Sequence, residues 1–95
     1  MFVIFLRYTP KRDTAGAFMA AHRRWIEQAR TDGAFALVGG LGDGTGGVIL
    51  AHGETRAQLD ARLALDPFVA ERIVAPEVHE VAPAWIDERL RFLAG

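Results

Sequence analysis

One histidine and one aspartate stand out because each lies among apolar residues of the kind that form a buried core. His22 comes four residues after Phe18 and three before Trp25, so on a helix it shares their apolar face. Asp66 lies in the stretch LALDPFVAER, three residues after Leu63. A carboxylate that hydrogen-bonds one ring nitrogen of a histidine fixes the tautomer and leaves the other nitrogen as a positioned acid or base. The two residues therefore predict proton transfer by His22, oriented by Asp66.

Both residues also have structural explanations, which the sequence alone leaves open. Asp66 precedes Pro67, and proline disfavours helical geometry in the residue before it while suiting the first turn of a helix. Asp66 is therefore also well placed to cap a helix that begins PFVAER. His22 is also explained as a neutral core histidine bonded to a backbone carbonyl. The two roles of Asp66 are compatible, because a capping carboxylate can still accept a hydrogen bond from a histidine.

The remaining titratable side chains do not make a metal site. His52 lies at a strand end and His79 in the last strand, and we expect both at the surface, with no spacing that joins them to His22. Arg7 lies on a strand face with apolar residues, where it is costly unless it meets an acidic side chain or an anionic ligand, and we favour the acidic side chain. Arg23, Arg24 and Glu27 are expected on the solvent side of the helix that carries His22. The sequence predicts no metal and no cofactor.

The elements that must position the pair are read from hydrophobic periodicity and turn signals. Residues 1–95 form a single domain without linker or repeat. The expected elements are a strand at 2–8, apolar on both faces; a helix from Asp13 or Thr14 to about Asp32, ended by Gly33; strands at 34–40 and 47–51, joined by LGDGTG; a helix opened by a Thr55–Gln58 capping box and running to about Leu65; a strand at 78–83; and a short amphipathic C-terminal helix at 84–93.

This order of strands and helices is typical of an α+β, ferredoxin-like βαββαβ fold, in which two helices cover one face of an antiparallel sheet. The other sheet face would then be bare, although the first strand is apolar on both sides. We therefore expect a homodimer whose sheets pack face to face, a dimeric α+β barrel, with any higher oligomer left open. Trp85, Leu90 and Leu93 are expected either to reach the partner or to fold back on their own subunit.

Composition narrows the function classes. Eleven Lys and Arg against twelve Asp and Glu leave a net charge of -1, so we expect no nucleic-acid or membrane partner. The chain has no cysteine, and its opening MFVIFLRY has neither a basic segment nor a small-residue cleavage site, so we expect a cytoplasmic protein.

The glycines at 42, 44 and 47 spell G-x-G-x-x-G, but they precede a strand rather than a helix, which argues against a dinucleotide site.

Four stretches of the chain together resemble a known family. The stretches AAHRRWIEQARTDG, LVGGLGDGTGGVILA, LDPFVAERIV and HEVAPAW, in this order and nearly from end to end, are similar to the YciI-like (YCII-related) family. The resemblance implies a dimeric α+β barrel of ferredoxin-like subunits, with a histidine and an aspartate, here His22 and Asp66, as the proposed active-site pair. Most members of that family have no assigned reaction, and the better-characterised ones include a dehydrochlorinase acting on a chlorinated hydroxyquinol.

Three function classes remain open. The leading one is a small cofactor-independent enzyme, a lyase, isomerase or dehydrohalogenase, in which His22 moves a proton of a small cyclic or phenolic molecule. The second is a ligand-binding or regulatory dimer without turnover. The third is a haem or metal protein with His22 as an axial ligand. For a small-molecule site, the expected apolar walls are Tyr8, Trp25 and Phe68, and the expected anion donors are the amides of Gly39 and Gly40.

Overall fold

A four-stranded antiparallel sheet forms the frame of the molecule. The computed structural model describes residues 1–94. The strands are β1 (Phe2–Tyr8), β2 (Phe35–Gly40), β3 (Gly46–Ala51) and β4 (Val74–Glu80), in the spatial order β2-β3-β1-β4. The helices are α1 (Ala15–Thr31), α2 (Arg56–Ala64) and α3 (Pro67–Ala70), with 3₁₀ helices η1 (Pro10–Thr14) and η2 (Glu88–Ala94).

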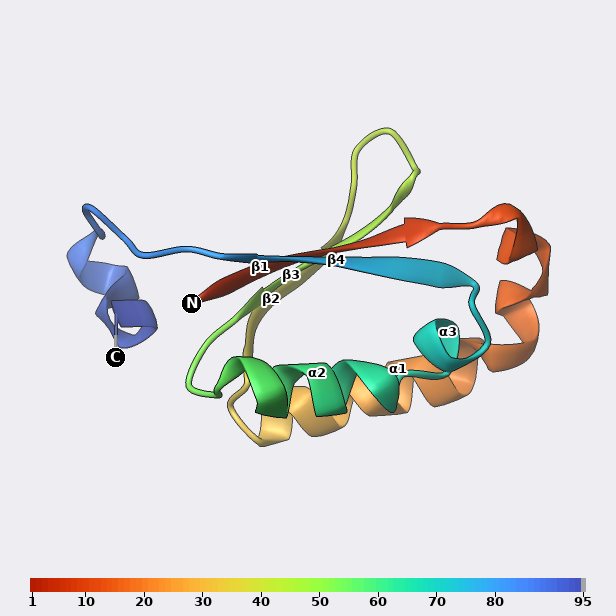
Figure 1. Cartoon of the computed structure of the whole chain (residues 1–95), viewed down its shortest axis with the longest axis horizontal. Coiled ribbons are helices and arrows are strands. Elements are labelled where there is room, and N and C mark those ends of the chain that lie inside the picture. The colour runs from red at the N-terminus through yellow and green to blue at the C-terminus, as the bar shows by residue number, and fades with distance from the viewer. Residues whose placement is uncertain (95) are drawn as a thin grey trace.

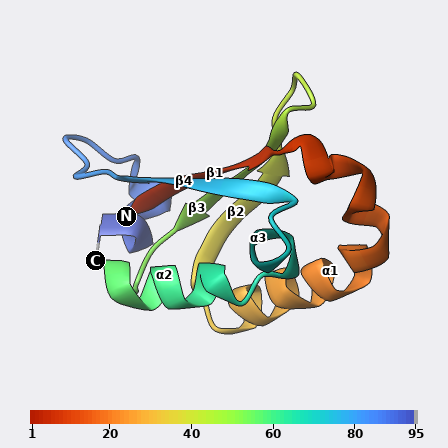
Figure 2. The same cartoon turned by 45° about the vertical axis from the view of Figure 1, so that its right-hand side comes forward.

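The helices α1, α2 and α3 all lie on one side of the sheet (Figures 1 and 2). This arrangement confirms the α+β, ferredoxin-like βαββαβ fold. Alternate residues of β1 account for it, because Phe2, Ile4 and Leu6 are buried under the helices whereas Val3 and Phe5 on the opposite face are only half-buried. The core therefore lies between the sheet and the helices, and the outer sheet face is left uncovered by them.

The helix boundaries follow the expected capping signals with one difference. Thr55 and Gln58 form the predicted capping box at the start of α2, each side chain accepting from the other residue's backbone N–H at 3.1 and 2.9 Å. Gly33, at φ +74°, follows the end of α1. At the other end of α1, Thr14 is the N-cap, which is one of the two expected residues, but its side chain makes no capping hydrogen bond. The unexpected feature is the 3₁₀ helix η1 before it, which Thr9 caps by accepting from the Lys11 N–H.

The last strand differs from the expected range of 78–83. It begins at Val74 and ends at Glu80, so it includes Pro76, which lies opposite Leu6. A proline is tolerated here because β4 is an edge strand and its free side needs no N–H donor. The strand therefore starts before the expected range and continues through the proline.

The C-terminal segment also differs from expectation, since the predicted helix at 84–93 is shorter and of the 3₁₀ type. It folds back on its own subunit, where Leu93 is buried and Phe92 meets the His52 ring edge-on at 5.3 Å. Leu90 remains half-exposed and Trp85 is 81% exposed. A short helix with so little buried surface gains too little from packing to complete an α-helix. None of the helices within residues 1–94 is long and apolar enough to cross a bilayer.

Candidate active site

The structure brings His22 and Asp66 into direct contact. His22 lies on α1, and its ring nitrogen Nδ1 is 2.7 Å from Oδ1 of Asp66. The histidine side chain is 13% exposed and the aspartate is fully buried. Since the carboxylate can only accept, Nδ1 donates, and the second ring nitrogen, Nε2, has no protein partner among the described residues. This arrangement fixes one tautomer and leaves Nε2 for a ligand.

Asp66 reaches His22 from a turn and not from the second helix as expected. It is the N-cap of α3, with extended backbone angles (φ -66°, ψ 123°) that suit a residue before Pro67. Its Oδ1 also accepts a hydrogen bond of 3.0 Å from the Phe68 N–H. The second carboxylate oxygen, Oδ2, is buried without a hydrogen-bond partner among residues 1–94. Oδ1 of Asp66 therefore both caps α3 and accepts the hydrogen bond from His22, so the two roles considered for Asp66 are both present.

Two aromatic rings fix the plane of the imidazole. The Phe68 ring stacks on His22 with centroids 4.0 Å apart and planes within 3°. The Trp25 ring lies 5.8 Å away at 26°, and its indole Nε1 donates to the Arg62 carbonyl at 2.9 Å. Because the indole is anchored in this way, the histidine ring is held both by hydrogen bonding at Nδ1 and by stacking.

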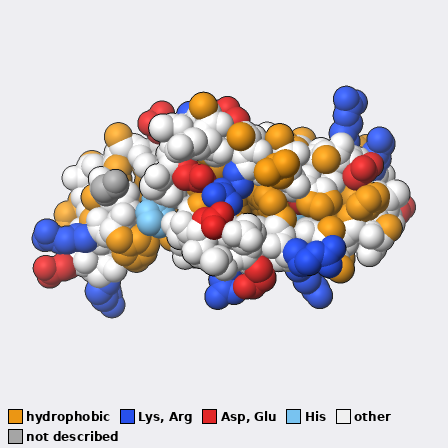
Figure 3. All heavy atoms as spheres, turned by 90° about the horizontal axis from the view of Figure 1, so that it is seen from below, with side chains coloured by type: hydrophobic (Ala, Val, Ile, Leu, Met, Phe, Trp, Pro, Cys, Tyr) orange, Lys and Arg blue, Asp and Glu red, His pale blue; other side chains and the backbone are white. Residues whose placement is uncertain are grey.

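Arg62, whose carbonyl accepts the Trp25 hydrogen bond, also forms ion pairs with two neighbouring segments. Its guanidinium bonds Glu54 through Nε at 2.9 Å and Asp32 through an Nη atom at 3.0 Å. The bond to Glu54 raises the pKa of Arg62, and bonds from Gln28 and then Arg62 lower the pKa of Asp32. The ion pairs thus join the end of α1, the loop before α2 and α2 itself. Basic and acidic side chains are interspersed over this helix side of the molecule (Figure 3).

A cleft of about 250 Å³ opens beside the histidine, between α1 and the sheet. Its walls come from all four strands and from α1 and α3, and its floor at β2 and β3 is glycine backbone without side chains. The lining residues are Leu6, Tyr8, Met19, His22, Arg23, Ile26, Gly39, Gly40, Gly46, Gly47, Phe68 and Val74. The cleft is therefore largely apolar, with a few polar groups at one side, as is common for small-molecule sites.

Of the expected binding residues, Tyr8 and Phe68 line this cleft and two others do not. Trp25 is buried behind the histidine and acts as packing for it. Arg7 lies on the opposite sheet face, where it bonds Glu77 at 3.0 Å and lowers the pKa of that carboxyl group. The ion pair favoured from the sequence is thus present, and neither Arg7 nor Trp25 lines this cleft.

Gly39 and Gly40 both line the cleft, but their backbone N–H groups point to different sides of β2. The N–H of Leu41 donates to the Gly46 carbonyl across the β2–β3 pair. Backbone groups of alternate residues in an antiparallel strand point to the same side, so Gly39 points its N–H toward β3 and Gly40 points away from it, at the free edge of the sheet. Only the Gly40 amide therefore remains available as an anion donor.

Sequence reasoning did not name seven residues of the cleft, which are Leu6, Met19, Arg23, Ile26, Gly46, Gly47 and Val74. Arg23 was expected on the solvent side of α1 because it follows the inward-facing His22. Position 46 has a structural reason to be glycine, since a Cβ there would lie 2.0 Å from the Leu6 carbonyl oxygen. Glycine is required there by the close approach of β1 and β3 and not only by the turn.

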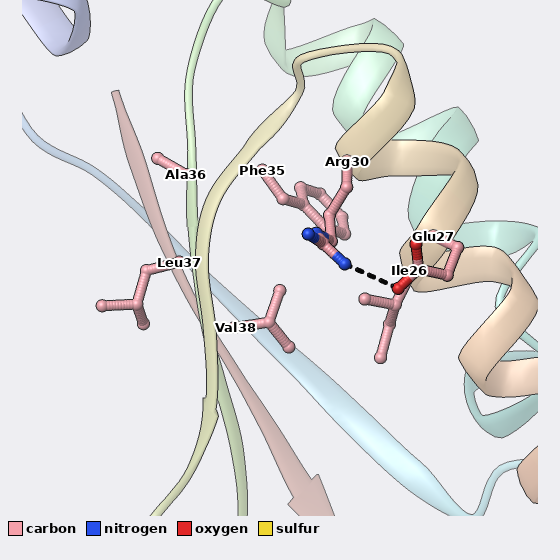
Figure 4. A pocket seen from close by; sticks show the side chains of 7 residues that line it. All are labelled: Ile26, Glu27, Arg30, Phe35, Ala36, Leu37 and Val38. Carbon is pink, nitrogen blue, oxygen red and sulfur yellow. Dashed lines mark hydrogen bonds and ion pairs between the residues drawn. The ribbon is translucent and has the colours of Figure 1, made fainter.

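A second hollow of about 350 Å³ lies farther along α1, against the edge strand β2 (Figure 4). Val38 and Ile26 point toward one another in it, whereas Leu37 points to the other side of the strand (Figure 4). Its two charged residues neutralise one another, because Arg30 bonds Glu27 at 2.7 Å. Although it is larger, this hollow presents no free acid, base or nucleophile, so the cleft at His22 is the better candidate site.

The described residues contain no group of three or more His, Cys, Asp or Glu side chains arranged to hold a metal ion. Histidine 22 has one carboxylate neighbour, Asp66, and His52 and His79 lie apart from it, with His79 exposed beside Glu77.

Comparison with known proteins finds a likeness in structure. No protein-family model matches the chain, and no curated protein sequence does. Among solved structures, the chain is similar to 5-chloro-2-hydroxyhydroquinone dehydrochlorinase (TftG) from Burkholderia phenoliruptrix AC1100, in complex with 2,5-dihydroxybenzoquinone. The TM-score is 0.70 at 20% sequence identity, and the match covers 84% of this chain and 91% of that one. At this identity the likeness establishes a shared fold.

Proposed function

We propose that the protein is a small cofactor-independent enzyme that uses His22 as a general acid or base on a small cyclic or phenolic molecule. The observation that carries the proposal is the 2.7 Å contact between Nδ1 of His22 and the buried Asp66, at the wall of a cleft. General acid–base catalysis needs a titratable group held in one orientation beside the substrate. Here the carboxylate and the stacked Phe68 supply that orientation.

The proton transfer is assigned to Nε2 of His22. Nε2 takes a proton from a carbon or hydroxyl group of the bound molecule, and the positive charge that forms on the imidazole faces the carboxylate of Asp66. The electron pair left on the substrate then forms a double bond. In an isomerase the proton returns to another atom, and in a lyase or dehydrohalogenase a neighbouring group leaves with the electron pair of its own bond.

The same proposal includes membership of the YciI-like (YCII-related) family. It is supported by His22 and the Asp-Pro-Phe motif of the sequence and by a fold shared with a dehydrochlorinase named for a chlorinated hydroxyhydroquinone. The cleft volume of about 250 Å³ lies just below the range of about 300–1,000 Å³ common for ligand pockets, which suits a molecule with one ring.

The proposal is tested by turnover with matched variants. Wild type, His22→Asn and Asp66→Asn are incubated with a panel of phenols, quinols and their chlorinated forms, and reaction is followed by ultraviolet absorption. Asparagine retains a donor close to the Nδ1 position and lacks Nε2, so His22→Asn removes the reacting atom while Asp66 keeps a partner. We expect turnover of at least one compound by wild type and a loss of about 10²-fold or more in His22→Asn.

Two other outcomes would replace the proposal. Binding of panel compounds that depends on His22, without any product, would favour a ligand-binding or regulatory protein. A coloured preparation with an absorption band that is lost in His22→Asn would favour a haem or metal protein. Equal turnover by wild type and His22→Asn would remove His22 from the chemistry.

We further propose a homodimer formed through the outer sheet face. Residues that pair directly across antiparallel strands point to the same face, so Val3 and Phe5 share the outer face with Leu50 and Val48. Leu37, opposite Leu50, extends this face and is 52% exposed. A second copy with the same apolar surface would cover it, because a two-fold interface pairs a patch with itself.

A further inference from the structure

The cleft at His22 has one positively charged lining residue, Arg23, and no acidic lining residue. Its lining includes one imidazole, one guanidinium from Arg23 and the phenol of Tyr8, and none of its lining residues is an aspartate or glutamate. The nearby carboxylate, Asp66, is fully buried behind the histidine and does not line the cleft. A bound anion would therefore meet attraction and no opposing carboxylate at the cleft surface.

Arg23 is left without an ion pair by the geometry of its own helix. The acidic side chain one turn along α1 is Glu27, but this carboxylate bonds Arg30 at 2.7 Å. Among the described residues, no carboxylate lies within ion-pair distance of Arg23. In the neighbouring hollow, by contrast, the arginine is already neutralised (Figure 4). Arg23 is thus the free guanidinium at the edge of the candidate site.

The remaining surfaces of the cleft select the shape of the ligand. Gly40 and Gly47 face one another across β2 and β3 and contribute only backbone, while Leu6, Met19 and Val74 supply apolar contact. A flat ring fits against such a floor. An arginine fork binds a carboxylate in one plane through two parallel hydrogen bonds, which suits a carboxylate attached to that ring.

We infer that Arg23 is a specificity-determining residue that binds the carboxylate of a small ring-bearing acid, so that the site takes carboxylated molecules in preference to their neutral counterparts. This inference rests on the proposed function for the role of His22 as the reacting group. Arg23 orients the ring by its carboxylate, and the atom that exchanges a proton lies at Nε2 of His22.

The experiment compares two probes that differ by one carboxylate, hydroquinone and 2,5-dihydroxybenzoate. Their dissociation constants are measured by titration, with backbone amide shifts of the cleft residues as the readout, for wild type, Arg23→Gln and Arg24→Gln. The neighbouring Arg24 has the same charge and does not line the cleft, so it controls for general electrostatic attraction. We expect wild type to prefer 2,5-dihydroxybenzoate by tenfold or more, as a charge-assisted hydrogen bond would give.

Arg23→Gln should abolish this preference by weakening the carboxylated probe alone, while Arg24→Gln should keep it. Equal affinity of wild type for the two probes, an equal loss in the two variants, or no shift of cleft amides with either probe would overturn the inference. Because the readout is a ratio of affinities, it is separate from the turnover assay. Loss of turnover in His22→Asn with equal probe affinities would leave the proposed function standing and remove Arg23 from recognition.

Discussion

Oδ1 of Asp66 accepts a hydrogen bond from Nδ1 of His22 at 2.7 Å, and the two residues lie 44 positions apart in the chain. The same oxygen accepts the Phe68 N–H at 3.0 Å and so caps α3. One atom therefore both orients the imidazole and starts the helix that carries the ring stacked on it. A change at Asp66 acts on the fold and on the site together, and the two effects need different substitutions to separate them.

Asp66→Ala and Asp66→Asn are expected to differ in stability. Alanine removes the cap of α3 and leaves the His22 donor without its acceptor, so the free energy of unfolding should fall by about 1–3 kcal/mol. Asparagine still offers an oxygen to the Phe68 N–H and should lose much less. Urea unfolding of both variants measures the difference. An equal loss in the two would mean that the carboxylate charge, and not the cap, carries the stability.

Gly46→Ala should destabilise the protein by about 1–3 kcal/mol, the usual cost of an added methyl group in a tightly packed site. The new Cβ would lie 2.0 Å from the Leu6 carbonyl oxygen, which is backbone and cannot move aside. Gly42→Ala is the control, since a Cβ at Gly42 meets nothing within 4 Å. Thermal unfolding of both variants checks the prediction, and equal melting temperatures would contradict the close approach of β1 and β3.

Gln28→Ala should make the protein less sensitive to acid. The side-chain bond from Gln28 is the largest cause that lowers the pKa of Asp32, followed by the bond from Arg62. A carboxyl group with a lowered folded pKa stabilises the protein above its ordinary pKa of about 4, and this contribution is lost as the pH falls toward the folded pKa.

The slope of unfolding free energy between about pH 5 and about pH 2 should therefore be smaller in Gln28→Ala than in wild type. Urea unfolding at a series of pH values measures it. In an Asp32→Asn background the glutamine should no longer matter. An unchanged slope in the single variant, or an equal change in the Asp32→Asn background, would show that the hydrogen bond of 2.9 Å between Gln28 and Asp32 does not set that pKa.

Leu50→Lys should convert the proposed dimer into a folded monomer. Leu50 lies on the outer sheet face between Val3 and Leu37, where a lysine would be buried unpaired in a face-to-face dimer. Leu65→Lys serves as the control, because Leu65 is 76% exposed at the end of α2, on the helix side. Sedimentation velocity at micromolar concentration distinguishes the two species. A monomeric wild type would end the dimer proposal.

Periodicity and turn chemistry were sufficient for most of the fold. The two-sided apolar strand at 2–8, the capping box at Thr55 and the glycine after α1 are local signals, and each is present where expected. The last strand was expected at 78–83 and runs from Val74 to Glu80, through Pro76. Whether a proline is tolerated in a strand depends on whether that strand is an edge, which only the full sheet order decides.

The candidate site was harder to predict because its lining is set by which elements meet. Spacing on α1 was enough to turn His22 inward, but it assigned the next residue, Arg23, to solvent, although a side chain at the rim can be exposed and still line a cleft. Arg7 could bind an anion, but it points to the other face of the sheet from Tyr8, because neighbouring residues of a strand alternate between faces. Neither outcome follows from residue types alone.

The two tryptophans of the chain occupy opposite environments, with Trp25 buried 5.8 Å from the His22 ring and Trp85 81% exposed in the tail. Replacing Trp85 by phenylalanine would leave a single indole, and it would be the one stacked near the imidazole. Trp25 would then be the only tryptophan, an intrinsic fluorescent probe beside the candidate site. The emission of such a variant would report changes at the neighbouring histidine without a label and before any substrate is known.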